Sequence, residues 1–144
     1  KETILTDNLT IIPILVPHRD EYSETVGFKI IGPKKSALFI PDIDKWEKWD
    51  KSIVRQIKSV DYAFLDATFY SGEEINSRDI SEIPHPFVIE SIDLFADLPE
   101  KEKSKIYFIH FNHTNPLIKN SSLEKEELEK LNFNVAEFMQ KFDL

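Results

Sequence analysis

The chain has 144 residues, of which 41% are hydrophobic and 12% aromatic, and it carries a net charge of −8. These values predict one globular domain with a real core, and the negative charge argues against non-specific binding of nucleic acid. The absence of cysteine excludes disulfides, thiol nucleophiles and cysteine-ligated zinc. No apolar run approaches the roughly 20 residues of a membrane span, and no signal peptide is visible. We therefore expect a cytoplasmic protein, with a missing N-terminal segment left open because the first residue is Lys1 rather than Met.

The first part of the chain predicts strands joined by loops and turns. Residues 9–16 are apolar and β-branched, and the predicted strand ends before His18. A second strand is predicted at residues 25–31, followed by a turn at residues 32–35. Residues 36–40 are apolar almost throughout, which predicts a third strand that is buried on both faces.

Beyond residue 40 the pattern changes to alternating helices and strands. Large apolar side chains spaced by three, four and four residues predict one amphipathic helix whose face packs in the core: Trp46, Trp49, Ile53 and Ile57. A strand is predicted at residues 61–66, and a polar loop follows over residues 70–84. Pro86 fits the first turn of a second helix, Pro99 stops that helix, and residues 105–111 form another predicted strand.

The C-terminal part predicts one further helix and an ambiguous tail. Ser121 and Glu124 have the spacing of a capping box at the start of a charged helix. Residues 132–144 suit either a final strand or a helix. A strand meander followed by alternating strands and helices predicts an α/β layered domain.

Four predicted strands each end near a histidine or an aspartate: His18, Asp42, Asp66 and His110. The ends of strands in α/β sheets commonly display ligand-binding groups, so these side chains are candidates for one site. Imidazole nitrogens combined with carboxylate oxygens suit zinc, iron or manganese. Taken singly, each residue has an ordinary alternative role in a loop, a turn or a helix cap.

The two remaining histidines leave alternatives open. His85 precedes the predicted helix, where a neutral imidazole beside spare N–H groups suits proton transfer or stabilisation of an oxyanion; simple capping is the alternative. His113 lies three residues after His110, so the two histidines either share one metal or divide into a ligand and a loop residue.

Five segments, in order, resemble proteins of the metallo-β-lactamase fold family, and most of all its pyrroloquinoline quinone biosynthesis protein B branch. They are HRDEYSETVGF, PDIDKWEKW, LDATFYS, IPHP and HFNHTNP, at residues 18–28, 41–49, 65–71, 83–86 and 110–116. The resemblance implies the C-terminal half of an αββα sandwich, with a mixed sheet and flanking helices. Residues 1–144 would then form a partial metallo-β-lactamase-like domain.

The resemblance also implies roles for individual residues. His18, Asp42 and His110 correspond to metal ligands, with Asp42 as the bridging group. His85 corresponds to a catalytic histidine near the substrate, and Asp66 would lie beside it. The implied cofactor is a divalent metal, zinc before iron or manganese.

Two departures from the family limit what this chain is expected to do. The HxHxDH motif, which lies upstream in the family and supplies most ligands of a binuclear site, is absent from the sequence. The tail also lacks the Asp-Gly turn expected near Phe138 and Met139. We therefore expect a piece of a metal-dependent enzyme that is inactive alone and need not retain the ion. In the complete protein it would act on a small-molecule or peptide-derived substrate, by hydrolysis or by an oxidative step. The alternative is a non-catalytic, degenerate module that acts through a partner, either as a homo-oligomer or with a missing N-terminal half.

Overall fold

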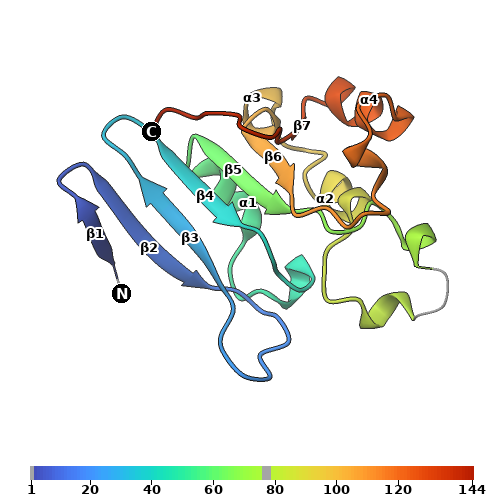
Figure 1. The fold of residues 1–144 in the computed structure, drawn as a ribbon, viewed down its shortest axis with the longest axis horizontal. Coiled ribbons are helices and arrows are strands. Elements are labelled where there is room, and N and C mark those ends of the chain that lie inside the picture. Colours follow the sequence, from blue (N-terminus) through green and yellow to red (C-terminus); the bar gives the residue numbers. More distant parts are fainter. Residues whose placement is uncertain (1, 76–78) are drawn as a thin grey trace.

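The computed structural model describes residues 2–75 and 79–144, which form one seven-stranded sheet in the order β1 to β7 (Figure 1). Strands β1 to β4 pair antiparallel, and β4 to β7 pair parallel. The strands are β1 Thr3–Thr6, β2 Leu9–Leu15, β3 Val26–Ile31, β4 Ser36–Ile40, β5 Tyr62–Asp66, β6 Ile106–Ile109 and β7 Asn134–Val135. The predicted α/β domain with a mixed sheet is therefore confirmed, and β1 is an additional strand that the sequence did not predict.

Short helices connect the parallel strands. The α-helices are α1 Ile53–Lys58, α2 Val88–Leu94, α3 Glu100–Lys103 and α4 Leu123–Lys130. The 3₁₀ helices are η1 Trp46–Lys48, η2 Gly72–Glu74, η3 Ile80–Glu82 and η4 Pro116–Ile118. Part of the predicted loop at residues 70–84 lies outside the described residues. None of the helices in the described ranges is long and apolar enough to cross a membrane.

The prediction of one continuous amphipathic helix from Trp46 to Ile57 is wrong. The chain forms η1, leaves the helical conformation at Trp49, and starts α1 only after the N-cap residue Ser52. The indole Nε1 of Trp49 donates a hydrogen bond to the carbonyl of Leu15, at 2.9 Å, which holds this break against the end of β2. The four predicted apolar side chains are nevertheless buried, so the prediction that they belong to the core is confirmed.

Two predicted helix starts are displaced. Helix α2 begins at Val88, and Pro86 precedes its N-cap residue instead of occupying the first turn. Helix α4 is capped by Ser122 rather than Ser121, because the Ser122 hydroxyl accepts a backbone N–H of the first turn. Pro99 does not stop α2, which already ends at Leu94; it serves as the N-cap residue of α3, a helix that the sequence did not predict.

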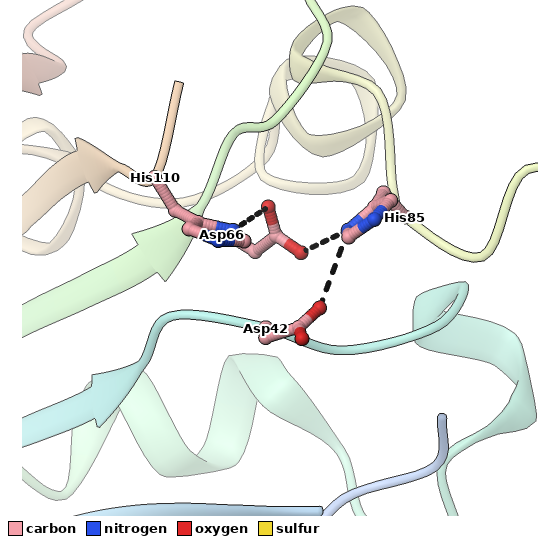
Figure 2. Close-up of side chains that lie close together, drawn as sticks. All are labelled: Asp42, Asp66, His85 and His110. Carbon is pink, nitrogen blue, oxygen red and sulfur yellow. Dashed lines mark hydrogen bonds and ion pairs between the residues drawn. The ribbon is translucent and has the colours of Figure 1, made fainter. Parts of the chain in front are cut away.

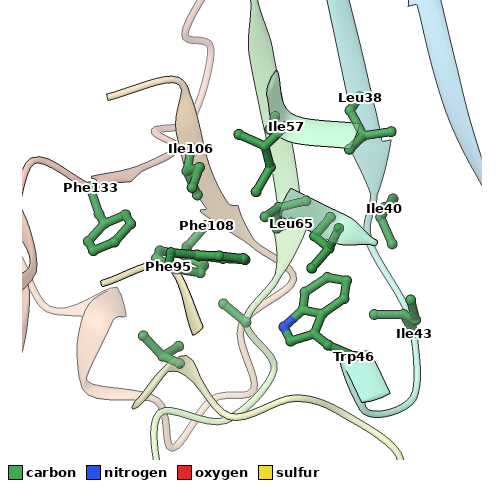
Figure 3. Packing of buried hydrophobic residues seen from close by; sticks show 14 of the residues in the cluster. Leu38, Ile40, Ile43, Trp46, Ile57, Leu65, Phe95, Ile106, Phe108 and Phe133 are labelled. Carbon is green, nitrogen blue, oxygen red and sulfur yellow. The ribbon is translucent and has the colours of Figure 1, made fainter. Parts of the chain in front are cut away.

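One face of the sheet, which we call the covered face, packs against the connecting helices. Its strand residues are almost fully excluded from solvent: Leu38, Ile40, Ala63, Leu65, Ile106 and Phe108. Ile57 of α1, Val88 of α2 and Phe95 just after α2 belong to the same core (Figure 3). Parallel strands added in one direction by crossovers of one hand place all their connections on one face. The core therefore forms on that side of the sheet.

The opposite face, which we call the open face, is apolar but only partly covered. Phe39 of β4 retains 36% of its surface exposed, so the prediction that β4 is buried on both faces is wrong. Phe28 of β3 is the cross-strand partner of Phe39, and Phe64 of β5 packs beside it with ring centroids 6.5 Å apart. The covering that exists on this side comes from the tail.

The tail forms the two-residue strand β7 and then runs across the open face without regular structure (Figure 1). The ring of Phe142 lies edge-on to Tyr62, Phe64 and Tyr107, with centroid distances of 5.2, 4.8 and 4.8 Å. Leu144 ends so close to Gly32 that a β-carbon there would lie 2.5 Å from it. The ambiguous segment is thus strand for two residues. A turn follows, in which the Gln140 N–H donates to the Glu137 carbonyl at 3.1 Å, and the last residues have no regular structure.

Candidate metal centre

The candidate site lies where β4, β5 and β6 end side by side. Asp66 is the last residue of β5, Asp42 follows β4 by two residues, and His110 follows β6 directly. His85 reaches the same place from the segment between η3 and α2 (Figure 2). Each of these four residues offers a ligand atom, and the atoms all lie within 4.8 Å of one another. Carboxyl ends of parallel strands meet at one edge of the sheet, which explains the convergence.

Asp66 is the buried centre of this cluster. Its Oδ2 lies 2.8 Å from His85 Nδ1 and accepts the backbone N–H of Ile43 at 3.2 Å. Its Oδ1 lies 3.5 Å from His110 Nδ1. Burial alone would raise the pKa of the Asp66 carboxyl, but its contacts with the His110 and His85 rings outweigh burial and hold the pKa below its ordinary value. Asp66 is therefore an ionised group inside the protein.

Thr68 ties the cluster together and was not predicted from the sequence. Its hydroxyl lies 2.7 Å from Asp66 Oδ1, 3.0 Å from His110 Nδ1 and 3.2 Å from His85 Nδ1. The Thr68 backbone N–H also donates to Asp66 Oδ1, at 2.9 Å. The residue could have been found as a hydroxyl two positions beyond a strand-end aspartate, where such a turn commonly forms.

His110 has a backbone φ of 65°, in the left-handed region that is unfavourable for residues with a β-carbon. This conformation ends β6 at Ile109, so the strand predicted over residues 105–111 is too long by two residues at that end and begins one residue later than predicted. It also places the imidazole beside Asp66, so the side chain of His110 does not continue the alternation between the two faces of β6. The contact with Asp66 raises the pKa of the His110 ring above its ordinary value, against a smaller opposing effect of burial.

His18 and Asp42 form the second half of the arrangement. His18 Nε2 lies 3.0 Å from Asp42 Oδ1, yet within the described part of the chain both atoms are buried without a hydrogen-bond partner. Asp42 Oδ1 is also 3.4 Å from His85 Nδ1. Buried polar atoms that lack partners are costly, whereas an imidazole nitrogen and a carboxylate oxygen are both good ligands for zinc-like ions. The residues present therefore fit a divalent metal.

All five site residues predicted from the sequence meet in this region. Asp66 and His85, expected beside the substrate, join Asp42 and His110 in the four-residue cluster. His18, expected as a ligand, contacts the cluster through Asp42. His113 lies outside that group.

His113 takes the loop position that was one of its two predicted roles, whereas the helix-terminus pocket expected at His85 does not form. His113 is exposed, with its Nδ1 3.1 Å from the Asn112 Oδ1 atom. His85 is not a helix cap, since the N-cap residue of α2 is Phe87, whose N–H donates to the side chain of Glu90 at 2.9 Å. His85 therefore faces carboxylates rather than the spare N–H groups of a helix terminus.

A cavity of about 610 Å³ opens beside the cluster. His18, Thr68 and His85 line it on the metal-centre side, and Phe69 and Arg19 contribute an aromatic ring and a cation. The Arg19 guanidinium donates to the carbonyl of Glu82 at 2.8 Å, which joins the loop after β2 to η3. A small organic molecule would fit there with its reacting atom close to the candidate ligands.

Comparisons with known proteins agree with this geometry. The family described as Beta-lactamase superfamily domain matches residues 2–111. Coenzyme PQQ synthesis protein B of Gluconobacter oxydans is 27% identical over 119 residues, covering 79% of this chain and 38% of the relative. The corresponding protein of Nitrosococcus oceani is 26% identical over 136 residues, covering 86% of this chain and 42% of the relative.

A solved structure extends the likeness to the whole chain. Zinc-bound PqqB from Methylobacterium extorquens superposes with a TM-score of 0.77 at 22% identity, covering 100% of this chain and 50% of that one. At this identity the match shows a shared fold. The chain spans half or less of the proteins it matches. With the family model matching most of its length and the fold shared throughout, the chain belongs to the beta-lactamase superfamily domain family, as a PqqB-like member with a metallo-β-lactamase fold.

Proposed function

We propose that this chain provides the histidine and aspartate ligands contributed by the C-terminal half of a metallo-β-lactamase-fold protein, and that the bound ion is zinc. The observation that carries the proposal is the convergence of histidine and aspartate side chains at one sheet edge. Ligand atoms of Asp42, Asp66, His85 and His110 lie within 4.8 Å of one another, and His18 Nε2 lies 3.0 Å from Asp42 Oδ1. His18 Nε2 and Asp42 Oδ1 face each other at 3.0 Å but form no hydrogen bond with any described residue, which supports a cation at the same place. A zinc-bound neighbour of the same fold favours zinc over iron or manganese.

The residues divide into ligands and groups that handle protons. His18, Asp42 and His110 would hold the ion, which when bound supplies a Lewis acid and lowers the pKa of coordinated water. Asp66 lies 2.8 Å from His85 Nδ1 and would fix that nitrogen as the protonated one. The Nε2 atom of His85 is then free to exchange a proton with a molecule in the adjoining cavity.

Zinc stoichiometry in single variants tests this division. The parent chain is expected to hold zinc after dialysis, measured by plasma mass spectrometry and calorimetric titration. Alanine variants of the three proposed ligands, His18, Asp42 and His110, should lose it, whereas His85→Ala should retain it. His113→Ala is the matched control, because His113 lies outside the cluster. A parent chain without zinc, or an Asp42→Ala variant that binds like His113→Ala, would contradict the proposal.

The complete protein would act on a small-molecule or peptide-derived substrate, either by hydrolysis or by an oxidative step of the kind suggested by its relatives' names. The chain alone is expected to be inactive, because the HxHxDH motif that supplies further ligands in this family is not in its sequence. A zinc-loaded sample should therefore not hydrolyse bis-p-nitrophenyl phosphate above the rate of free zinc. Turnover abolished by Asp42→Ala would show that this half is catalytic by itself. The cytoplasmic location remains a prediction.

A second candidate function, association through the open face, has its own supporting observation. Phe39 on this face is 36% exposed, and Phe28 and Phe64 lie beside it within one apolar surface. The solved neighbour has twice the length of this chain, so this fold carries further material beyond the matched half. We propose that two copies of this chain associate through their open faces. Exposed apolar patches of this kind commonly mark interfaces.

Light scattering after size exclusion tests the association. A dimer is expected for the parent, and Phe39→Lys should give a monomer because it places a charge within the apolar face. Leu123→Lys is the matched control, since Leu123 is also exposed but lies on α4. A parent chain that remains monomeric at high concentration would contradict this second proposal without touching the first.

A further inference from the structure

Two lysines among residues 2–75 and 79–144 are buried to the same degree, but they differ in how close their partners are. Lys45 and Lys125 are each 8% exposed. The Lys45 ammonium lies 2.9 and 2.7 Å from the two carboxylate oxygens of Glu90, and 4.0 Å above the ring of Phe87. Charge-assisted hydrogen bonds of this length satisfy a buried cation. Lys45 is therefore a structural residue.

Lys125, in the first turn of α4, is held much more loosely. Its Nζ lies 3.5 Å from the amide oxygen of Asn120 and 3.9 Å from a carboxylate oxygen of Glu137. An ammonium has three donors, and neither of these contacts has the length of a normal charge-assisted hydrogen bond. Lys125 thus presents donor capacity that a closer acceptor would take up.

Lys125 lines a cavity of about 470 Å³, whose other lining residues come from η4, β7 and the segments that flank them. Phe111, Ile118, Val135 and Phe138 give the cavity apolar and aromatic walls. Phe111, which lines this cavity, directly follows His110 in the sequence. One lining residue of the cavity is therefore the chain neighbour of a residue of the candidate metal centre. Apolar walls with one charged anchor are the usual composition of a site for a small organic ligand.

We propose that this cavity binds a small organic acid, with its carboxylate on Lys125 and its apolar or aromatic body against Phe111 and Ile118. Glu137 is 72% exposed and sits 3.9 Å from the ammonium, so in the free chain its carboxylate occupies the position that the ligand's carboxylate would take. A monoanion matches the single cation better than a phosphate dianion, given the net charge of −8. The inference uses no residue of the metal centre and stands independently of the proposed function.

Binding of 3-phenylpropionate to the zinc-free chain tests the site, with 3-phenylpropanamide as the uncharged probe of the same shape. Removal of zinc prevents the carboxylate from binding a metal instead. Titration followed by ¹H–¹⁵N NMR should give saturable shifts at Phe111, Ile118 and Lys125 for the acid. The amide should bind at least about tenfold more weakly, as expected for loss of a charge-assisted hydrogen bond. Equal affinity for the two probes, or shifts that gather away from this cavity, would overturn the proposal.

Two variants move the affinity in opposite directions. Lys125→Met should weaken binding of 3-phenylpropionate by about 10- to 100-fold, whereas Glu137→Gln should strengthen it by removing the competing carboxylate. Lys130→Met, an exposed lysine of the same helix, is the matched control and should bind like the parent. Unchanged affinity in a folded Lys125→Met chain, or weaker binding in Glu137→Gln, would contradict the assignment. If Lys125→Met does not fold, the acid–amide comparison and Glu137→Gln still decide it.

Discussion

The two faces of the sheet are built from the same strands but differ in how they are covered. On the covered face Leu38, Leu65 and Phe108 are fully buried, whereas on the open face Phe39 keeps 36% of its surface exposed. The difference follows from connectivity, because the crossover segments between parallel strands all lie on one side. The covered face is closed by segments adjacent in sequence, and the open face is partly covered by the tail.

The largest expected effect is on the free energy of unfolding, and it is tested by replacing one phenylalanine on each face with alanine. Phe95→Ala should lower the free energy of unfolding by about 3–5 kcal/mol, because it leaves a cavity where the side chain is fully buried. Phe39→Ala should cost about 1 kcal/mol, because that ring is partly in water already. Urea unfolding, carried out at a protein concentration too low for the chains to associate, measures both losses.

Equal losses for the two variants would break the comparison, since they would show that the open face is as tightly packed as the other. A Phe39→Ala chain that unfolds with a changed m-value would point to altered compactness instead of altered packing. Because both variants replace phenylalanine with alanine, the pair compares how much each face contributes to the free energy of unfolding.

The second effect concerns a buried hydrogen bond in the core of the covered face. Ser91 of α2 is fully buried, and its hydroxyl accepts the indole N–H of Trp46 at 2.9 Å. Ser91→Ala should cost about 1–3 kcal/mol, because the buried indole N–H loses its acceptor. Thermal unfolding of this variant can be compared with that of Ser121→Ala, an exposed serine that is expected to leave stability unchanged. A neutral Ser91→Ala would show that this hydrogen bond adds nothing to the packing.

Much of the covered face could be predicted from the sequence, because its strands and apolar helix residues follow local patterns. The strand at residues 36–40 was predicted with its true bounds, whereas the helix from Trp46 to Ile57 was not. There the break is held by a long-range hydrogen bond from Trp49 to Leu15, which no local pattern reveals. The exposure of Phe39 on the open face was missed for a related reason, because an apolar sequence does not indicate which segments will cover each face of the strand.

The candidate site could be predicted in membership but not in arrangement. The strand-end positions of His18, Asp42, Asp66 and His110 and the position of His85 before a helix follow from sequence order, and the family resemblance assigned their roles. Their grouping depends on the left-handed backbone at His110, with a φ of 65°, and on the Thr68 hydroxyl, and both are features of the folded chain. Composition and spacing carry no information about the backbone of His110, whereas the place of Thr68, two residues beyond a strand-end aspartate, can be found in the sequence.

A smaller effect concerns the cap of α4, the helix that closes the end of the covered face through the buried Leu128. Ser122→Ala should cost about 1 kcal/mol, because its hydroxyl accepts a backbone N–H of the first turn. Ser121→Ala should cost nothing, although the sequence pattern favoured Ser121 as the cap. Chemical denaturation of both variants gives the answer, and the reverse order would restore the sequence-based assignment.

The smallest expected effect lies on the open face, at the ring of Phe142. Phe142→Ala should lower stability by roughly 0.5–1 kcal/mol, because its edge-on contacts with Tyr62, Phe64 and Tyr107 are lost but no closed cavity forms. The newly exposed rings should instead raise the fluorescence of a bound apolar dye and favour association of the chain. Phe138→Ala, which removes a ring that is 96% exposed, should change neither quantity. A loss as large as that of Phe95→Ala would mean that the tail completes a second core, and the open face would then need no further partner.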